Sequence, residues 1–131
     1  MRILIVGGGT MGRHIAQALP EHEITLIEKN PDKCFRIRDE MKHVNVIEGD
    51  GSKLYILKRA DFDNVDAVVA VANNDELNLF VCLLALKKGK KAVARVHEPD
   101  FIPMFTEAGI TNIIAPEHRA AMDIAKKIVW E

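Results

Sequence analysis

The residues that most clearly suggest a chemical function form a glycine-rich loop close to the start of the chain. Residues 7–12 read Gly-Gly-Gly-Thr-Met-Gly, and Gly7, Gly9 and Gly12 form the pattern G-x-G-x-x-G. The loop follows an apolar run at 2–6 and opens a helical pattern, which is the context in which this motif binds phosphate. We expect Gly7 to allow a tight turn, Gly9 to admit a pyrophosphate and Gly12 to let helix and strand pack closely.

The helix that begins in this loop is a second reason to expect phosphate binding. The first N–H groups of a helix have no partner within it, and the helix dipole places partial positive charge there. Gly8, Thr10 and Met11 lie in the loop and are predicted to contact the same ligand. The alternative is a glycine turn that serves packing alone.

Two acidic residues follow apolar runs and are predicted to bind the adenosine half of a dinucleotide. Glu28 ends the run at 24–27, where a carboxylate accepts hydrogen bonds from ribose hydroxyls and repels a 2′-phosphate, although Lys29 softens that repulsion. Asp50 lies in the loop after the next run, near the expected adenine, and Gly51 leaves the backbone free to approach a planar ring. The alternatives are an exposed strand-end acid at Glu28 and a plain Asx turn at Asp50.

Four more residues lie at the ends of later apolar runs. Ala72, Asn73 and Asn74 follow the run at 67–71, where a doubly wound sheet has its switch point, and they are predicted to line the ligand site. Asn74 is equally suited to cap the next helix. Arg95 stands near the end of an otherwise apolar run, where a guanidinium reaches either a phosphate or an acidic partner in an edge ion pair.

These residues need a scaffold in which several strand ends meet at one edge. Short apolar runs alternate with helical patterns along the whole chain, which predicts βαβ units and a parallel sheet. Right-handed crossovers then give a doubly wound Rossmann fold, a six-stranded parallel sheet of order 3-2-1-4-5-6 with helices on both faces. We expect strands near 2–6, 24–27, 44–47, 67–71, 92–96 and 112–115, and helices near 12–19, 30–41, 53–60, 76–88, 99–107 and 117–130.

Composition narrows the class of protein. The 131 residues are 48% hydrophobic and carry a net charge of −1, which predicts a single folded domain, 1–131, that is cytosolic, with no signal peptide and no direct membrane insertion. Nucleic-acid binding is not expected, because the basic cluster at 87–91 is better explained as complementing a helix C-terminus. Cys34 and Cys82 are expected to be reduced thiols.

Taken together, several segments resemble the N-terminal nucleotide-binding half of RCK/KTN (TrkA-N) domains, as in the peripheral subunit of Trk-type potassium uptake systems. The segments are Ile3-Leu-Ile-Val-Gly-Gly-Gly, Leu26-Ile-Glu-Lys-Asn, Val46-Ile-Glu-Gly-Asp-Gly, Asp66-Ala-Val-Val-Ala, Asp75-Glu-Leu-Asn78, Ala94-Arg-Val and Ile114-Ala-Pro-Glu117. The resemblance covers essentially the whole chain. Its most specific parts are the Gly-Asp turn, Asp-Glu-x-Asn and Ala-Arg-Val.

The resemblance implies a regulatory subunit of a potassium channel or transporter rather than a catalyst. It implies NAD(H) or ATP/ADP at the first turn, and a homo-oligomer, dimer or ring, that gates ion transport through a membrane-embedded partner at the inner face of the cell membrane. By the same resemblance Glu28 contacts ribose, Asp50 contacts adenine, and Arg95 contacts a phosphate or a neighbouring subunit. Glu117 lies near the nucleotide or a subunit contact, or else simply complements its helix dipole. Gly51-Ser52 departs from the residues common in the family.

A small NAD-dependent oxidoreductase is the alternative function. Such an enzyme needs a substrate pocket and a proton donor near the nicotinamide. His97 is the best placed of the five histidines, but six strands and their helices leave no residues for a substrate domain.

The last helical pattern predicts self-association. Ala120, Ala121, Ile124, Ala125 and Ile128 recur at helical spacing, and a domain of this size covers only part of so apolar a helix. Packing of the helix wholly on its own sheet is the alternative.

Overall fold

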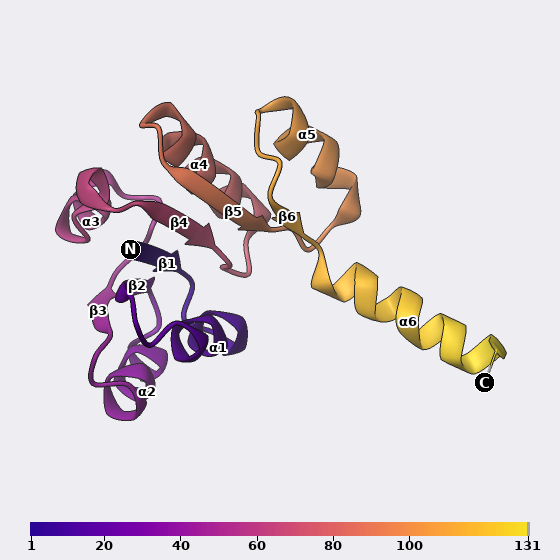
Figure 1. Ribbon diagram of the computed structural model, residues 1–131, viewed down its shortest axis with the longest axis horizontal. Helices are drawn as coiled ribbons and strands as arrows, with labels where there is room; N and C mark the ends of the chain where they lie inside the picture. Colours follow the sequence, from indigo (N-terminus) through magenta and orange to yellow (C-terminus); the bar gives the residue numbers. More distant parts are fainter. Residues whose placement is uncertain (131) are drawn as a thin grey trace.

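The computed structural model describes residues 1–130 and contains one parallel sheet of six strands (Figure 1). The strands are β1 (Arg2–Val6), β2 (Glu23–Glu28), β3 (Asn45–Glu48), β4 (Ala67–Ala70), β5 (Lys91–Arg95) and β6 (Ile113–Ile114). Their order is β3-β2-β1-β4-β5-β6, and every neighbouring pair is parallel. The predicted doubly wound Rossmann fold is therefore confirmed.

Helices cover the two faces of the sheet unequally. They are α1 (Thr10–Ala18), α2 (Pro31–Glu40), α3 (Leu54–Arg59), α4 (Asp75–Lys87), α5 (Ile102–Glu107) and α6 (Pro116–Trp130), with short 3-10 turns η1 (Phe62–Asn64) and η2 (Pro99–Phe101). On one face the core joins the sheet to α3, α4 and α5, with Leu57, Val81 and Phe105 among its members. On the other face it joins the sheet to α1 and α2 through Ala16, Cys34 and Ile37.

The central strands are buried because both of their faces are covered. Leu4, Ile5 and Leu26 have no exposed surface, and the continuous apolar runs that predicted these strands are the expected pattern for a parallel sheet. Cys34 and Cys82 are buried and unbridged, and burial raises the pKa of the Cys82 thiol to about 12. Both cysteines therefore serve as small core residues.

Two predicted helix starts are confirmed in detail. The Asn30 side chain accepts hydrogen bonds from the backbone N–H groups of Asp32 and Lys33 and so caps α2, with Pro31 in its first turn. The Asn74 side chain accepts from Leu77 N and caps α4.

The end of the chain departs from the sequence-based expectations. The predicted strand at 112–115 is only the pair Ile113–Ile114, because only these two residues pair with β5 and α6 begins at Pro116. The predicted helix at 99–107 begins as the η2 turn before it becomes α5. α6 then extends away from the body, and none of its described residues is buried (Figure 1). Within the described residues, no helix has both the length and the apolar character required to cross a bilayer.

Candidate functional site

A cleft of about 930 Å³ opens along the carboxyl edge of the sheet. The loops that follow β1, β2, β3 and β4 line it, together with Arg95 at the end of β5. It is lined by all but one of the predicted site residues, namely Gly7, Gly8, Gly9, Thr10, Met11, Glu28, Lys29, Asp50, Gly51, Ala72, Asn73, Asn74 and Arg95. The exception is Gly12, which lies beneath the loop. Strand ends far apart in the sequence thus meet at one edge, as the topology requires.

The glycine loop has the shape that its motif predicts. Gly7 has a φ of 115°, and a Cβ there would lie 2.7 Å from Ala72 N, so the turn passes close to the end of β4. A Cβ on Gly12 would lie 1.9 Å from the carbonyl oxygen of Gly7, which fixes how closely α1 packs on the strand. A Cβ on Gly9 would meet nothing within 4 Å, so this position opens into the cleft.

Glu28 fastens the glycine loop to the end of β2. One carboxylate oxygen accepts from Gly8 N at 2.8 Å and the other from Asn30 N at 2.7 Å. Hydrogen bonds from two backbone N–H groups hold the side chain at the cleft wall in one orientation. Glu28 is therefore a fixed part of the cleft wall and not merely an exposed strand-end acid.

Asp50 makes the Asx turn that was the structural alternative for it. Its Oδ1 accepts from Ser52 N at 2.9 Å, and this hydrogen bond holds the pKa of the Asp50 carboxyl below its ordinary value. The residue also lines the cleft beside Gly51. Its carboxylate is consequently ionised and fixed at the end of the cleft near β3.

A buried amide that the sequence did not single out for a role ties the cleft wall together. Asn78, on α4, has no exposed surface; its Oδ1 accepts from Ala72 N, and its Nδ2 donates to Ala72 O and to Arg95 O, both at 2.9 Å. The side chain thereby sets the spacing between the ends of β4 and β5. The available signal was a polar residue in the middle of an otherwise apolar helical run.

Asp75 performs a similar task one turn earlier on α4. Its Oδ1 accepts from His97 N at 2.8 Å and lies 3.0 Å from His97 Nδ1, while its Oδ2 accepts from Glu98 N. Burial raises the pKa of Asp75, but these hydrogen bonds lower it by more, so the pKa lies below its ordinary value. His97 is therefore fixed behind the end of β5 and does not line the cleft.

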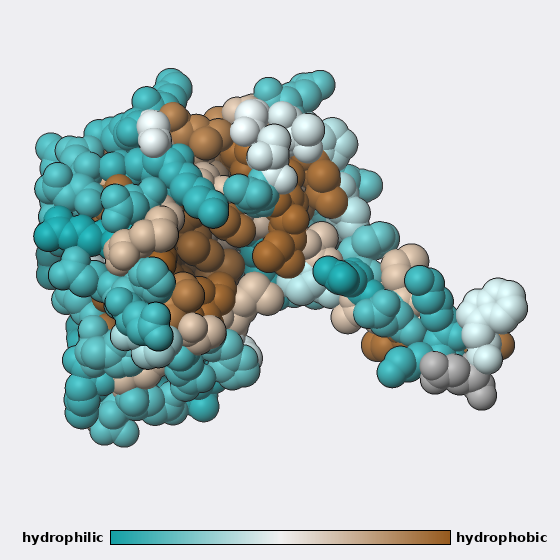
Figure 2. Space-filling view, viewed as in Figure 1, coloured by the Kyte–Doolittle hydropathy of each residue, from teal (hydrophilic) through white to brown (hydrophobic). Residues whose placement is uncertain are grey.

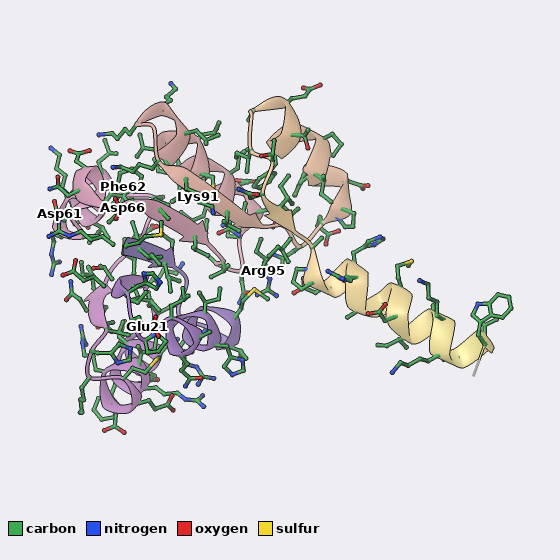
Figure 3. All side chains as sticks on the ribbon, in the orientation of Figure 1. Glu21, Asp61, Phe62, Asp66, Lys91 and Arg95 are labelled. Carbon is green, nitrogen blue, oxygen red and sulfur yellow. The ribbon has the colours of Figure 1, made fainter. Side chains whose placement is uncertain are left out.

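Arg95 connects the cleft to the beginning of α6. Arg95 lies beside the start of α6 (Figure 3). Its guanidinium pairs with Glu117 in the first turn of α6, which is the edge ion pair that the sequence left open. Burial raises the pKa of Glu117, but the hydrogen bond and charge of Arg95 lower it by more, so its pKa also lies below its usual value. Arg95 Nε and His97 Nε2 are both buried without a hydrogen-bond partner.

The sequence motifs did not predict several residues that line the cleft. Arg13, Lys33 and Arg36 line the cleft beside Lys29, and Phe80 lines it from α4. Lys33 and Arg36 lie one turn apart on the helix that begins directly after the predicted ribose-binding strand end. That spacing was the signal, since it places both cations on the side of α2 that faces the cleft.

The chain matches proteins of known families. The TrkA-N domain family matches residues 3–116. The chain is 37% identical to the Trk system potassium uptake protein TrkA homolog of Methanothermobacter thermautotrophicus, over 98% of this chain and 60% of that protein. It is 31% identical to the Trk system potassium uptake protein trkA homolog 1 of Methanosarcina mazei, over 95% of this chain and 32% of that protein, so it spans about a third of that relative's length.

Solved structures share the fold at lower identity. The Kef CTD of Shewanella denitrificans, solved in an AMP-bound form, has a TM-score of 0.83 and 18% identity, over 100% of this chain and 83% of that one. The GsuK channel bound to NAD has a TM-score of 0.73 and 21% identity, over 88% of this chain and 21% of that one. At these identities the likeness shows the fold alone.

Proposed function

The chain belongs to the TrkA-N domain family, and from this premise we propose that it is a nucleotide-sensing regulatory module of a potassium transporter or channel. In this proposal NAD(H) or ATP/ADP binds in the carboxyl-edge cleft. Binding changes an assembly of several copies, at the inner face of the cell membrane, that acts on a membrane-embedded partner. The relatives named as Trk potassium uptake proteins, and the Kef and GsuK structures that hold AMP and NAD, support it.

The observation that carries the proposal is the order of chemical groups along the cleft. Asp50 lies at the β3 end, Glu28 follows at β2, and the glycine loop with the start of α1 follows at β1. An adenosine diphosphate group presents its own groups in the same order. The adenine amine and the ribose hydroxyls are hydrogen-bond donors, and the diphosphate that follows them is an acceptor. The cleft thus offers each part of an adenosine diphosphate group a complementary partner.

The charge at Glu28 favours NAD(H) over NADP(H). Its carboxylate is held by Gly8 N and Asn30 N where it would meet a 2′-phosphate. Lys29, Lys33 and Arg36 line the same end, and their positive charges oppose this repulsion.

Calorimetric titration of the full chain with NADH, NADPH, ATP and ADP tests the binding and its selectivity. NADH should bind more tightly than NADPH, and Glu28→Gln, which removes the charge and keeps one of the two acceptor oxygens used by Gly8 N and Asn30 N, should narrow that difference. Equal affinity of the unsubstituted chain for NADH and NADPH would refute the role of Glu28. Absence of binding by every adenine nucleotide would refute the proposed function itself.

The proposal treats the cleft as a binding site and not as a catalytic centre. No histidine is among the described residues that line it, and His97 is held by Asp75 with its Nε2 turned toward Glu117. NADH incubated with carbonyl substrates should therefore show no turnover above background. A robust rate abolished by His97→Ala would instead favour the small oxidoreductase.

The assembly in this proposal is built from α6 and a second copy of the chain. α6 exposes Ile124, Ile128 and Trp130, which is 82% exposed. The sheet surface beyond α1 carries partly exposed Val69 and Val93, paired in register. Apolar surface is open on the body as well as along α6 (Figure 2). One chain thus carries two apolar surfaces, and an exchange of α6 between two copies would bury both.

A further inference from the structure

Positive charge gathers where the cleft passes between α1 and α2, which lie on the same face of the sheet (Figure 1). Four basic side chains line this part of the cleft, namely Arg13, Lys29, Lys33 and Arg36. The carboxylates beside them are Glu28, which lines the cleft, and Glu40, which pairs with both arginines. Four cations against two carboxylates leave a surplus of two positive charges here, on a chain whose net charge is −1. Such a surplus within a cleft attracts anions.

Glu40 fixes the two arginines in place. Its Oε2 lies 3.3 Å from Nη1 of Arg13, and its Oε1 lies 3.0 Å from Nε of Arg36. The hydrogen bond from Arg36 holds the pKa of the Glu40 carboxyl below its ordinary value, so this carboxylate is ionised at neutral pH. One carboxylate therefore joins α1 to α2 and occupies a single nitrogen of each guanidinium. The other N–H groups of both guanidinium groups remain for a ligand.

Arg13 is much more deeply placed than an ordinary surface cation. Its side chain is 12% exposed, whereas that of Arg36 is 59% exposed. A charged side chain that is so largely covered normally has partners for its charge, and Arg13 shares its one carboxylate with Arg36. A planar guanidinium with free N–H groups is suited to bind the oxygens of a phosphate. We call Arg13, Lys33 and Arg36 together the α1–α2 wall.

The chemistry of ribose determines which phosphate would reach this wall. C3′ is bonded to C4′, which carries the 5′ phosphates, whereas C2′ is bonded to C1′, which carries the base. With the base at Asp50 and the 5′ phosphates at the glycine loop, the 3′ oxygen lies on the β1 side of the ribose and the 2′ oxygen on the β3 side. Arg13 extends from α1, the helix that follows β1. A phosphate on the 3′ oxygen is therefore the one directed toward the α1–α2 wall.

We propose that the α1–α2 wall is a subsite for a phosphate on the 3′ oxygen of the ribose, so that a 3′-phosphorylated adenine nucleotide binds more tightly than the same nucleotide with a free 3′ hydroxyl. This inference rests on the proposed function and names a narrower ligand class for the same cleft. A phosphate monoester carries nearly two negative charges at neutral pH, which matches the surplus positive charge of this part of the cleft. Arg13 and Arg36 are the binding residues, and Lys33 adds positive charge beside them.

The first test compares three ligands by calorimetric titration of the full chain at one ionic strength. They are AMP, adenosine 3′,5′-bisphosphate and adenosine 2′,5′-bisphosphate. The 3′,5′-bisphosphate should bind about tenfold more tightly than AMP, the gain expected from one hydrogen bond to a charged group. The 2′,5′-bisphosphate should gain less than about twofold, because its second phosphate lies on the base side of the ribose and meets Glu28.

The second test removes the wall one charge at a time. Arg36→Gln, at a side chain exposed enough to be replaced without disturbing the fold, should reduce the tenfold gain to about threefold and leave AMP affinity within about twofold. Arg13→Gln should do the same, and Arg13→Lys, which keeps the charge, should keep part of the gain. Arg59→Gln provides the matched control, because Arg59 lies on α3 and is not among the described residues that line the cleft.

The outcomes separate this inference from the proposed function. If AMP binds and the 3′,5′-bisphosphate binds no more tightly, the subsite is refuted and nucleotide binding stands. If the two bisphosphates gain equally, or if Arg59→Gln acts as strongly as Arg36→Gln, general attraction by positive charge explains the gain and a site at the 3′ oxygen is refuted. If none of the adenine nucleotides binds, the inference and the proposed function both fail.

Discussion

Helices α4 and α6 are similar in length but opposite in what they bury. α4 has 13 residues, and its buried members include the polar Asp75 and Asn78. α6 has 15 residues, and even Ile128 is 78% exposed. Burial here follows the place of a helix in the architecture, because α4 packs against β4 and β5 whereas α6 begins after the last strand of the sheet. The buried polar groups on α4 are therefore structural, and the exposed apolar groups on α6 are available for a partner.

The largest effect should come from removing a buried polar group of α4. Asn78→Leu keeps the branched heavy-atom skeleton of the side chain but leaves Ala72 N, Ala72 O and Arg95 O without their partners. We expect it to lower the free energy of unfolding by about 3–5 kcal/mol, measured by urea denaturation. The exposed cleft residue Asn73 provides the control, since Asn73→Ala should cost less than about 0.5 kcal/mol. A cost of less than about 1 kcal/mol for Asn78→Leu would show that water or backbone shifts replace the amide.

The next effect should appear in association and not in folding. Ile124→Asp combined with Ile128→Asp places charge on the exposed apolar stripe of α6, where the monomer buries nothing. We expect self-association to weaken by about 2–3 kcal/mol, roughly 30- to 150-fold, as measured by light scattering across protein concentration.

The matched control for that prediction is Lys126→Gln. It lowers the charge of α6 by one without altering its apolar stripe, and it should leave self-association unchanged. A chain that is monomeric at tens of micromolar before any substitution, on the order of ordinary association constants, would contradict the pairing of α6 with a second copy.

Acid should lower the free energy of unfolding by protonating Asp75, the buried carboxylate of α4. Its folded-state pKa lies below the ordinary value, so below about pH 4 the unfolded chain binds more protons than the folded one and stability falls as pH falls. The loss should be on the order of 1.5–3 kcal/mol, the typical contribution of a hydrogen bond to a charged group. Urea denaturation between pH 5 and pH 3, two pH values that bracket an ordinary aspartate pKa of about 3.9, should show a shallower decline in Asp75→Asn. An unchanged slope would mean that other carboxylates dominate.

The smallest expected effect comes from making the same substitution, Ala to Gly, once in α4 and once in α6. Ala85 on α4 is fully buried, whereas Ala121 on α6 is exposed. Ala85→Gly should lower the free energy of unfolding by about 1 kcal/mol or more, from helix propensity and the lost methyl group. Ala121→Gly should reduce helical circular dichroism while leaving the cooperative unfolding of the body within about 0.5 kcal/mol. Equal losses in the two variants would show that α6 folds together with the body.

Much of the fold and the outline of the site could be predicted because their signals are local. The apolar runs identified all six strands, and Asn30 and Asn74 marked helix starts that the structure confirms. The cleft lining followed from topology, since parallel strands bring their carboxyl ends to one edge. β6 was predicted too long, because only two of its residues pair with β5 before α6 begins.

The sequence by itself determined the sheet order and the glycine loop, because apolar period, glycine position and right-handed crossovers leave few arrangements to choose from. Only the tertiary structure decided which partner each charged group takes. Lys88 pairs with Asp63, and Lys90 donates to the carbonyls of Asp63 and Val65, so the basic cluster anchors the η1 turn. Arg95 meets Glu117 across 22 residues of chain. Such contacts depend on how elements distant in sequence are brought together, and no local sequence pattern indicates which charged residues will meet.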